Sequence, residues 1–345
     1  MLHVVVRTGS GVAAAIGDHM AAMPEFDHHL LVSRDETCPI GDHLERRATS
    51  VIDLPAGHLA PIRRLRDVSR ELAPDVVHAH SSHAGAYVRL ALGAQQQARV
   101  VYTPHCYAFE RTDVAWPVRS AFWLVEAALS FRGAQVAACS PLETTLARSL
   151  PGRQQVTYVP NIAPDLDLDG ADPSPTMRVS AAGRVSAQKA PWLFAAAARR
   201  NREDANPAEW VWIGGGDHDQ EAVLRAAGVA VTGWLPRDEA VRCLARSHVY
   251  VHTASWESAP MTILEAAAIG VPVVARRTRA MEALGIAPLF DSETGLLELL
   301  ADFPGGPSAD LARRCGEAIR LEHTLHAQAR ALDIVYGRAQ ETAHA

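Results

Sequence analysis

The stretch VVVRTGSGVAAAI, residues 4–16, passes from an apolar, β-like run through two glycines into a run of small residues that favours a helix. Gly9, Gly11 and Ala14 fit the G-x-G-x-x-A spacing of dinucleotide-binding loops, and Asp35 follows where a ribose-binding acid is expected. A strand, a glycine turn and a helix in this order predict the first unit of a parallel α/β sheet. The glycines alone leave open whether the ligand is NAD or another phosphate compound.

The alternation of Val-rich apolar runs with helical patterns continues along the chain. The runs LHVVV, HHLLVS, DVVHAH, RVVYTP, AQVAAC and VTYVP come before a segment rich in Pro and Asp, residues 160–176. The pattern then restarts with MRVSAAG, EWVWIGGG, VAVTGW, HVYVHT and VPVVAR. Such alternation predicts βαβ units, whose ligands bind at the carboxyl ends of the strands. We therefore predict an α/β fold class with two doubly wound, Rossmann-like domains (1–160 and 177–322), a linker (161–176) and a C-terminal helix (323–345) that can pack on either domain.

Composition and charge exclude several classes of protein. A formal net charge of −6 over 345 residues, with no run of like charge, argues against nucleic acid as a partner. No apolar run reaches the ~18 residues of a membrane span, and the sequence opens on a strand-like run, so we expect a cytoplasmic protein without a signal peptide. Five scattered cysteines without a C-x-x-C pair argue against a disulfide framework or a thiolate zinc site, and we expect reduced, mostly buried thiols.

The most informative stretch is WESAPMTILEAAAIGVPVVA, residues 256–275. Glu257 follows a predicted strand, and Pro260 suits the first position of a helix whose unpaired amides at 261–264 favour a phosphate. Glu265, one turn further in, can accept hydrogen bonds from both hydroxyls of a ribose, while Glu257 can reach a sugar ring. A diphosphate between ribose and sugar is a nucleotide sugar. The alternative is that both acids merely cap or solvate a helix start.

A second cluster lies in AAGRVSAQKAPW, residues 181–192. Arg184 and Lys189 fall in the predicted loop after the first strand of the second domain. Two cations at the carboxyl end of a strand can clamp a diphosphate whose negative charge grows as a glycosyl bond breaks. The alternative is a loop with two solvated cations.

These motifs, in this order, resemble glycosyltransferase family 4, the retaining enzymes of GT-B fold. The resemblance rests on GRVSAQK, IGGG, VTGW and the pair Glu257-x7-Glu265 with EAAAIGVPVVA in the second half. In the first half, DVVHAHSSHAG and VVYTPHCYAF look like the family's acceptor-domain strands. The resemblance implies two Rossmann-like domains that face each other across a cleft, with the nucleotide-sugar donor held by the second.

The resemblance also implies a role for each matching residue. His105 corresponds to the active-site histidine beside the transferred sugar, Arg184 and Lys189 to the pair on the donor diphosphate, Glu257 to the acid near the donor sugar and Glu265 to the acid on the ribose. The remaining implied contacts are to the donor by Gly9, Gly11, Gly214, Gly215, Trp234, Met261, Thr262, Ile263 and Leu264, and to the acceptor by His80 and His83.

The sequence departs from the family at three places. Ala190 and Pro191 follow Lys189 where the family often has glycine, and His83 stands where relatives often have lysine. The segment after GVPVVA lacks the usual glycines and prolines, so the resemblance is weakest over 276–307.

Two other clusters contain residue types that can bind a metal ion. His78, His80 and His83 cluster at a predicted strand end, but no acid completes a metal set there, so we expect His80 or His83 to hydrogen-bond the acceptor. The acids of DLDLD (Asp165, Asp167 and Asp169) lie in the linker, where no strand end aims them. We predict no metal and no cofactor.

The segment WPVRSAFWLVEAALSFR, residues 116–132, carries four aromatic and two basic side chains. Such a helix can lie on a membrane surface and would suit a lipid-linked acceptor. Its apolar periodicity favours the alternative, a helix packed on the core.

The sequence therefore predicts a cytoplasmic, metal-independent, retaining hexosyltransferase. It would move a sugar from a nucleoside diphosphate, UDP rather than GDP, to a hydroxyl of a saccharide or lipid-linked acceptor. We expect a role in polysaccharide biosynthesis and peripheral contact with the inner membrane surface. Three alternatives remain: an NAD-dependent dehydrogenase that uses Gly9, Gly11 and Asp35, a GT-B nucleotide-sugar epimerase, and a non-catalytic nucleotide-sugar-binding subunit.

Overall fold

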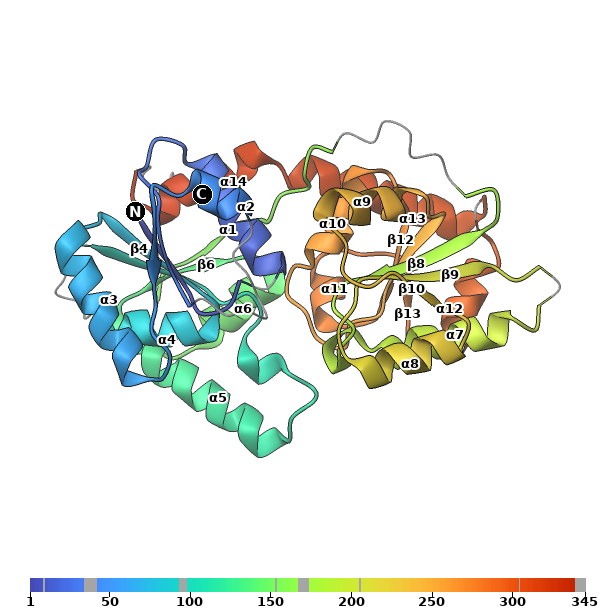
Figure 1. Ribbon diagram of the computed structural model, residues 1–345, viewed down its shortest axis with the longest axis horizontal. Helices are drawn as coiled ribbons and strands as arrows, with labels where there is room; N and C mark the ends of the chain where they lie inside the picture. Colours follow the sequence, from blue (N-terminus) through green and yellow to red (C-terminus); the bar gives the residue numbers. More distant parts are fainter. Residues whose placement is uncertain are drawn as a thin grey trace. The chain divides into compact units, whose positions relative to one another are not determined.

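The computed structural model describes residues 1–8, 10–33, 42–92, 98–152, 154–166, 174–204, 206–303 and 305–338. The chain divides into two compact units (Figure 1). The first comprises Met1–Ile162 and the segment that starts at Thr324, and the second comprises Ala163–His323.

The first unit is built on a seven-stranded parallel sheet with strand order β3-β2-β1-β4-β5-β6-β7. Its central strands β1 and β4 are buried along their whole length, as expected of a sheet covered on both faces. The strands are β1 (Leu2–Val5), β2 (His29–Val32), β3 (Ser50–Asp53), β4 (Val76–His80), β5 (Arg99–Thr103), β6 (Gln135–Ala138) and β7 (Val156–Tyr158).

Helices cover both faces of this sheet, with α1 and α14 on one side and α3, α4 and α5 on the other (Figure 1). The helices are α1 (Ser10–Ala22), α2 (Asp42–Arg47), α3 (Leu59–Leu72), α4 (Ser81–Ala91), α5 (Trp116–Leu129), α6 (Pro141–Ser149) and α14 (Leu325–Val335), with 3-10 turns at Ala108–Glu110 and Ser130–Arg132.

The last helix, α14, belongs to the first unit although it follows the whole second unit in the chain. Its buried Leu332 and Val335, and Tyr336 just after it, share an apolar cluster with Val101 and Ala137 of the first sheet. The side-chain amide of Gln328 also donates to the carbonyl of Pro160 at 2.8 Å. The predicted C-terminal helix thus completes the core of the first unit.

The second unit repeats the doubly wound pattern on a six-stranded parallel sheet, with strand order β10-β9-β8-β11-β12-β13. Its strands are β8 (Arg178–Ala182), β9 (Glu209–Ile213), β10 (Ala230–Val231), β11 (Val249–His252), β12 (Val273–Arg276) and β13 (Leu289–Phe290). Its helices are α7 (Pro191–Asn201), α8 (His218–Ala226), α9 (Arg237–Ala245), α10 (Met261–Ala268), α11 (Arg279–Ala283), α12 (Glu293–Leu300) and α13 (Pro307–Glu322), with a 3-10 turn at Ala187–Lys189.

The predicted α/β class with two parallel sheets is confirmed, and each predicted apolar run contains a strand. The short edge strands β3 and β13 were not predicted, because Ser50–Asp53 and Leu289–Phe290 are too short or too polar to stand out. Several helix starts follow local capping rules: the side chains of Ser140, Asp217 and Thr324 each accept a hydrogen bond from the backbone N–H three residues on.

Two expectations about side-chain burial are wrong. Helix α5 is not packed on the core along its length: Trp116 is 76% exposed, Leu124 62% and the nearby Phe131 67%. Only Glu126, Ala127 and Leu129 of this helix are buried. The cysteines in the described ranges are free, as expected, but of these only Cys139 is buried, while Cys38 lies outside those ranges. Over the same part of the chain, no helix combines the length and the apolarity that crossing a bilayer requires.

Candidate functional site

The topological switch point of the second sheet lies between β8 and β11. These strands are parallel neighbours, but β8 connects to β9 on one side and β11 connects to β12 on the other. The connections from these two strands therefore run in opposite directions along the sheet, and the carboxyl ends of the strands at such a point are the general ligand site of open α/β sheets. The loop after β8 contains Arg184 and Lys189, and the loop after β11 contains Glu257.

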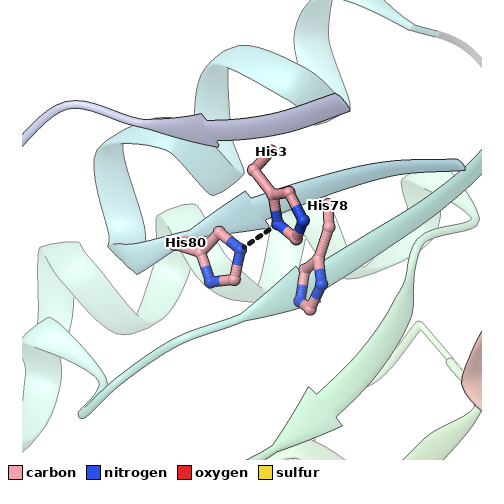
Figure 2. Close-up of side chains that lie close together, drawn as sticks. All are labelled: His3, His78 and His80. Carbon is pink, nitrogen blue, oxygen red and sulfur yellow. Dashed lines mark hydrogen bonds between the residues drawn. The ribbon is translucent and has the colours of Figure 1, made fainter. Parts of the chain in front are cut away.

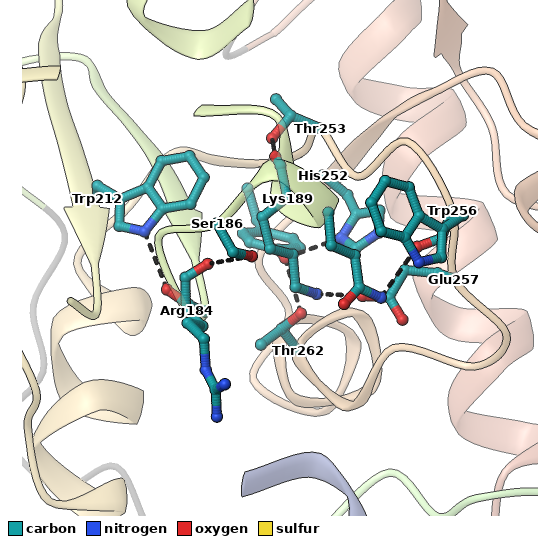
Figure 3. A network of polar contacts seen from close by, with 12 residues as sticks. Arg184, Ser186, Lys189, Trp212, His252, Thr253, Trp256, Glu257 and Thr262 are labelled. Carbon is teal, nitrogen blue, oxygen red and sulfur yellow. Dashed lines mark hydrogen bonds and ion pairs between the residues drawn. The ribbon is translucent and has the colours of Figure 1, made fainter. Parts of the chain in front are cut away.

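Lys189 and Glu257 meet at this switch point as an ion pair between Nζ and Oε1, with side chains 16% and 15% exposed (Figure 3). Lys189 ends the 3-10 turn, and Ala190 then adopts a left-handed conformation, φ +47°, before Pro191 starts α7. A left-handed residue is needed here to turn the chain into the helix, which explains why glycine suits this position.

Further hydrogen bonds tie the two loops together. The backbone N–H of Ser255 donates to the carbonyl of Gln188 at 2.8 Å, and the side-chain amide of Gln188 donates to the carbonyl of Trp256 at 3.1 Å. The hydroxyl of Thr253 donates to the carbonyl of Lys189. The position of the Lys189–Glu257 pair is thus fixed by main-chain contacts as well as by charge.

Arg184 is placed differently from Lys189. Its side chain is exposed and points away from the ion pair (Figure 3), and its guanidinium has no hydrogen-bond or ion-pair partner among the residues the structure describes. The structure therefore does not bring Arg184 and Lys189 together into one clamp. Arg184 offers a free cation at the rim of the switch point.

The start of α10 faces the same loops. Pro260 precedes the helix, no side chain caps it, and the backbone N–H groups of Met261 and Thr262 have no acceptor in the described ranges. The amide of Ile263, which the sequence predicted to be unpaired, donates to the carbonyl of Pro260 at 3.1 Å. Two free amides and the positive end of the helix dipole remain for an anion. The Thr262 hydroxyl is anchored by the hydroxyl of Tyr250 at 2.7 Å.

Glu265 lies in the second turn of α10 beside Arg237 of α9. Nε and Nη2 of Arg237 both lie 3.1 Å from Oε1 of Glu265, whose side chain is 15% exposed. Burial raises the pKa of Glu265, and the Arg237 charge opposes this shift. Arg237 was not predicted as a site residue, since an arginine at a predicted helix start carries no distinct signal.

The glycine that directly follows β9, Gly214, is required by its backbone conformation and by a close backbone contact. Gly214 has φ +131°, and a Cβ there would lie 2.3 Å from the carbonyl oxygen of Gly183. A Cβ on Gly215 would lie 3.2 Å from Glu221. Trp234, after β10, is 61% exposed and can offer its ring to a ligand. The predicted donor residues of the second unit thus all come from the carboxyl edge of one sheet.

His105 lies after β5 of the first unit in a strained turn. It has φ +50° and the next residue, Cys106, has φ +80°, both in the left-handed region that non-glycine residues avoid. Oε1 of Glu143 accepts a hydrogen bond from the backbone N–H of Cys106, and Oε2 accepts one from Cys139, each at 2.8 Å. The buried Glu143, which sequence reasoning missed, thus holds this turn in place.

The predicted acceptor histidines differ in accessibility. His80, the last residue of β4, is fully buried, and its ring nitrogens hydrogen-bond His3 and His105. His83, in the first turn of α4, is exposed. Gly11 lies in α1, whereas Gly9 and Asp35 lie outside the described residues.

In the described ranges, three potential metal ligands lie close together. These are His3, His78 and His80, whose ligand atoms lie within 4.8 Å of one another (Figure 2). His83, the expected third member of a histidine group, is replaced by His3 because β1 pairs with β4. Asp165 is exposed, and Asp167 and Asp169 lie outside the described part.

Comparison with known families agrees with this geometry in both units. Residues 10–162 match the family model described as glycosyl transferase 4-like domain, and residues 176–313 match that of glycosyl transferases group 1. With a glycosyltransferase domain matched in each half, the chain belongs to the glycosyltransferases of the group 1 and family 4 type. Its two parallel-sheet units are those of the GT-B fold.

Individual proteins similar to this chain are distant in sequence. An uncharacterised 41.2 kDa protein in the cps region of Klebsiella pneumoniae is 23% identical over 317 residues, which cover 86% of this chain and 85% of that protein. HepE of Anabaena, solved in complex with UDP-glucose, has a TM-score of 0.78 at 17% identity, covering 98% of this chain and 99% of its own. Sucrose-phosphate synthase from Thermosynechococcus elongatus also has a TM-score of 0.78, at 15% identity and 98% coverage of both chains.

Proposed function

We propose that this glycosyltransferase moves a hexosyl group, with retention of configuration, from a UDP-sugar to a hydroxyl of a saccharide or lipid-linked acceptor. The observation that carries the proposal is the Lys189–Glu257 pair at the switch point of the second sheet, next to the uncapped start of α10. A cation, free amides and an acid within one crevice suit a diphosphate joined to a sugar.

The donor is assigned to the second unit by charge. The diphosphate accepts hydrogen bonds from the backbone amides of Met261 and Thr262 and from the Lys189 ammonium. The exposed side chain of Arg184 rotates to bind it as well. Negative charge grows on the diphosphate as the glycosyl bond breaks, so cations placed there stabilise the transition state more than the ground state. In this proposal the cations of the protein do the work of a metal ion, and no cofactor takes part.

Two acids complete the donor site. Once the diphosphate takes over Lys189, Glu257 is released to accept hydrogen bonds from sugar hydroxyls. Glu265 accepts hydrogen bonds from the ribose hydroxyls, and the Arg237 charge opposes the rise of its pKa that burial causes.

UDP is favoured over GDP by likeness alone. HepE, which shares the fold, was solved with UDP-glucose, and the Klebsiella relative is described by its place in a cps region. The second point fits a role in polysaccharide biosynthesis at the cytoplasmic side of the membrane.

In the first unit, His105 is assigned to the transferred sugar. Burial lowers the pKa of His105 to about 4, so its ring is neutral at pH 7 and serves as a hydrogen-bonding group rather than as a cation. His83 remains as an exposed group for the acceptor. The exposed aromatic face of α5 with Arg132 suits a peripheral contact with lipid, from which a lipid-linked acceptor can be drawn.

The test is a thermal-shift screen of UDP, GDP, ADP and TDP sugars, followed by product analysis with and without added acceptors. A ligand at 100 times its Kd stabilises the folded state by about 2.7 kcal/mol, which raises Tm measurably. Turnover of the donor to an isomer without acceptor identifies an epimerase instead. Binding of a nucleotide sugar without turnover on any acceptor identifies a binding subunit. A rise in Tm with NAD but with none of the nucleotide sugars identifies a dehydrogenase.

A further inference from the structure

Four imidazole rings form a continuous hydrogen-bonded chain inside the first unit. Nε2 of His28 lies 2.9 Å from the carbonyl oxygen of Met23, and its Nδ1 lies 3.1 Å from Nε2 of His3. Nδ1 of His3 lies 3.1 Å from Nε2 of His80 (Figure 2), and Nδ1 of His80 lies 3.1 Å from Nε2 of His105. The one nitrogen of these rings with no partner in the described ranges is Nδ1 of His105.

The positions of the rings follow from strand pairing. In the register of β1 with β4, His3 is the partner of His78, and His80 lies two residues further on the same face of the sheet. That face is covered by α1 and α14, and His28 lies just before β2, the other neighbour of β1. The chain of rings therefore crosses the centre of the sheet and ends at the His105 turn that Glu143 holds.

All four rings are neutral at pH 7. Burial is the main cause that lowers the pKa of each, well below the ordinary value for His3 and His80 and to about 4 for His105. For His28 burial also lowers the pKa, although the Met23 carbonyl opposes the shift. Each ring then carries one N–H and one lone pair.

One carbonyl group fixes where these protons lie. A carbonyl oxygen only accepts, so His28 must donate to Met23 from Nε2, and its Nδ1 must accept from Nε2 of His3. Nδ1 of His3 must then accept from Nε2 of His80, whose Nδ1 accepts from Nε2 of His105. Four protons fill four hydrogen bonds, all donated towards Met23.

We propose that His28, His3 and His80, the first three rings of this histidine chain, are a tautomer lock on the fourth: they hold the proton of His105 on Nε2 and leave its Nδ1 as a bare hydrogen-bond acceptor. Nδ1 of His105 accepts a hydrogen bond from a hydroxyl group of the ligand. Under the proposed function, this is a hydroxyl of the transferred sugar or of the acceptor. His28, His3 and His80 are positioning residues that act through His105.

His78 does not disturb this order. Its nitrogens lie 2.9 Å from the Tyr336 hydroxyl and 2.8 Å from the Thr103 hydroxyl, and a hydroxyl can donate or accept. A metal bound to Nε2 of His80 requires a different proton order. That nitrogen would have to be bare and its proton on Nδ1, which reverses the donor and acceptor at His105. A metal site and the lock are therefore exclusive and can be told apart.

The tautomers are read from nitrogen chemical shifts of histidine in the full-length protein labelled with 15N-histidine. We expect a single tautomer at His105, with the proton on Nε2, and the same at His80, His3 and His28. The signal of each ring is assigned from its single substitution. A proton on Nδ1 of His105, or a mixture of tautomers there, overturns the lock. Added Zn²⁺ that shifts the His3 and His80 nitrogens in stoichiometric amount also overturns it and identifies a metal site.

Two substitutions at the far end of the chain separate the lock from simple packing. In His28→Gln the amide can still donate to Met23 and accept from His3, so the tautomer of His105 and the turnover should stay as they are. In His28→Leu the chain loses its fixed end, and His105 should become a mixture of tautomers with turnover reduced about tenfold. The control is His19→Leu, which should leave the tautomer unchanged. The buried His19 ring lies next to that of His80, and among the described residues its Nδ1 has no hydrogen-bond partner.

Equal nitrogen shifts of His105 in His28→Leu and wild type overturn the proposal. The wild-type spectrum decides it alone where His28→Leu does not fold. The inference rests on the proposed function only for the identity of the ligand hydroxyl. The tautomer is measured without substrate, so an absence of glycosyl transfer and a failure of the lock give different results.

Discussion

Lys189 and Glu257 are 68 residues apart in the chain and form an ion pair across the switch point of the second sheet. Removal of the ammonium by Lys189→Ala should reduce kcat by about 10²- to 10³-fold, since one electrostatic stabiliser of a developing charge is lost, and should change KM much less. Lys189→Arg keeps the charge and should recover part of the rate. The control is Arg200→Ala, at an exposed cation of the same unit that contacts Thr294. Equal kcat in Lys189→Ala and the control excludes this role.

Glu265→Ala should weaken nucleotide binding by about tenfold or more, because hydrogen bonds to a charged group contribute about 1.5–3 kcal/mol. The sharper measurement compares UDP with dUDP by calorimetry. Wild type should prefer UDP, whereas the variant should bind both with similar Kd, since the group that distinguishes the 2′-hydroxyl is gone. If the preference for UDP persists in the variant, the ribose is held elsewhere.

Glu126→Ala should lower the free energy of unfolding by about 3–5 kcal/mol, because it leaves Arg89 buried without its counter-charge. Oε2 of Glu126 lies 2.9 Å from Arg89, and its Oε1 accepts from Tyr102 at 3.0 Å. The exposed pair Arg111–Asp113 is the matched control, and Asp113→Ala should cost at most about 1 kcal/mol. Urea unfolding monitored on the first unit measures both, and similar losses would contradict the argument.

The first unit should lose stability on mild acidification. Burial lowers the pKa of His105 from 6.5 to about 4 and that of His19 from 6.5 to about 3. Below pH 6.5 the unfolded chain therefore binds protons that the folded chain does not, and the free energy of unfolding falls as pH falls through this window. Each such histidine contributes up to about 1.4 kcal/mol per pH unit. Urea unfolding at pH 7, 6 and 5 should show this slope, and His19→Leu should reduce it. A free energy of unfolding that stays constant from pH 7 to pH 5 would contradict this prediction.

The exposed aromatic face of α5 should bind anionic vesicles. The double substitution Trp116→Glu and Trp123→Glu should abolish co-flotation with phosphatidylglycerol vesicles, because it places two charges where apolar rings would enter the interface. Leu321→Glu, at an 81% exposed position of α13, is the control and should bind like wild type. Equal flotation of all three proteins means that α5 does not carry the contact.

The fold was predictable because a parallel sheet buried on both faces leaves Val-rich runs that mark its strands. The donor site was predictable in part for the same reason, since Lys189 and Glu257 each lie in the loop that follows such a run. The orientation of Arg184 and the partner of Glu265 were not, because they depend on side-chain placement across elements that no local pattern reports.

The histidines show this limit most clearly. The sequence drew attention to His78, His80 and His83, which are close along the chain, whereas the structure joins His80 to His3, His28 and His105 through sheet register and turns. A histidine inside the apolar run LHVVV was a signal that could have been used. The exposed face of α5 was missed because apolar spacing does not tell whether a neighbour covers it.

The place of α14 has a consequence for how the protein is made. On the ribosome, the sheet of the first unit is synthesised early, but Leu332, Val335 and Tyr336, which close its apolar cluster, are added only after all of the second unit. The two units therefore cannot mature strictly in chain order, and the nascent first unit must wait, with part of its core uncovered, for nearly the whole polypeptide to emerge. A chain stopped before Leu325 should accumulate as a species that chaperones retain.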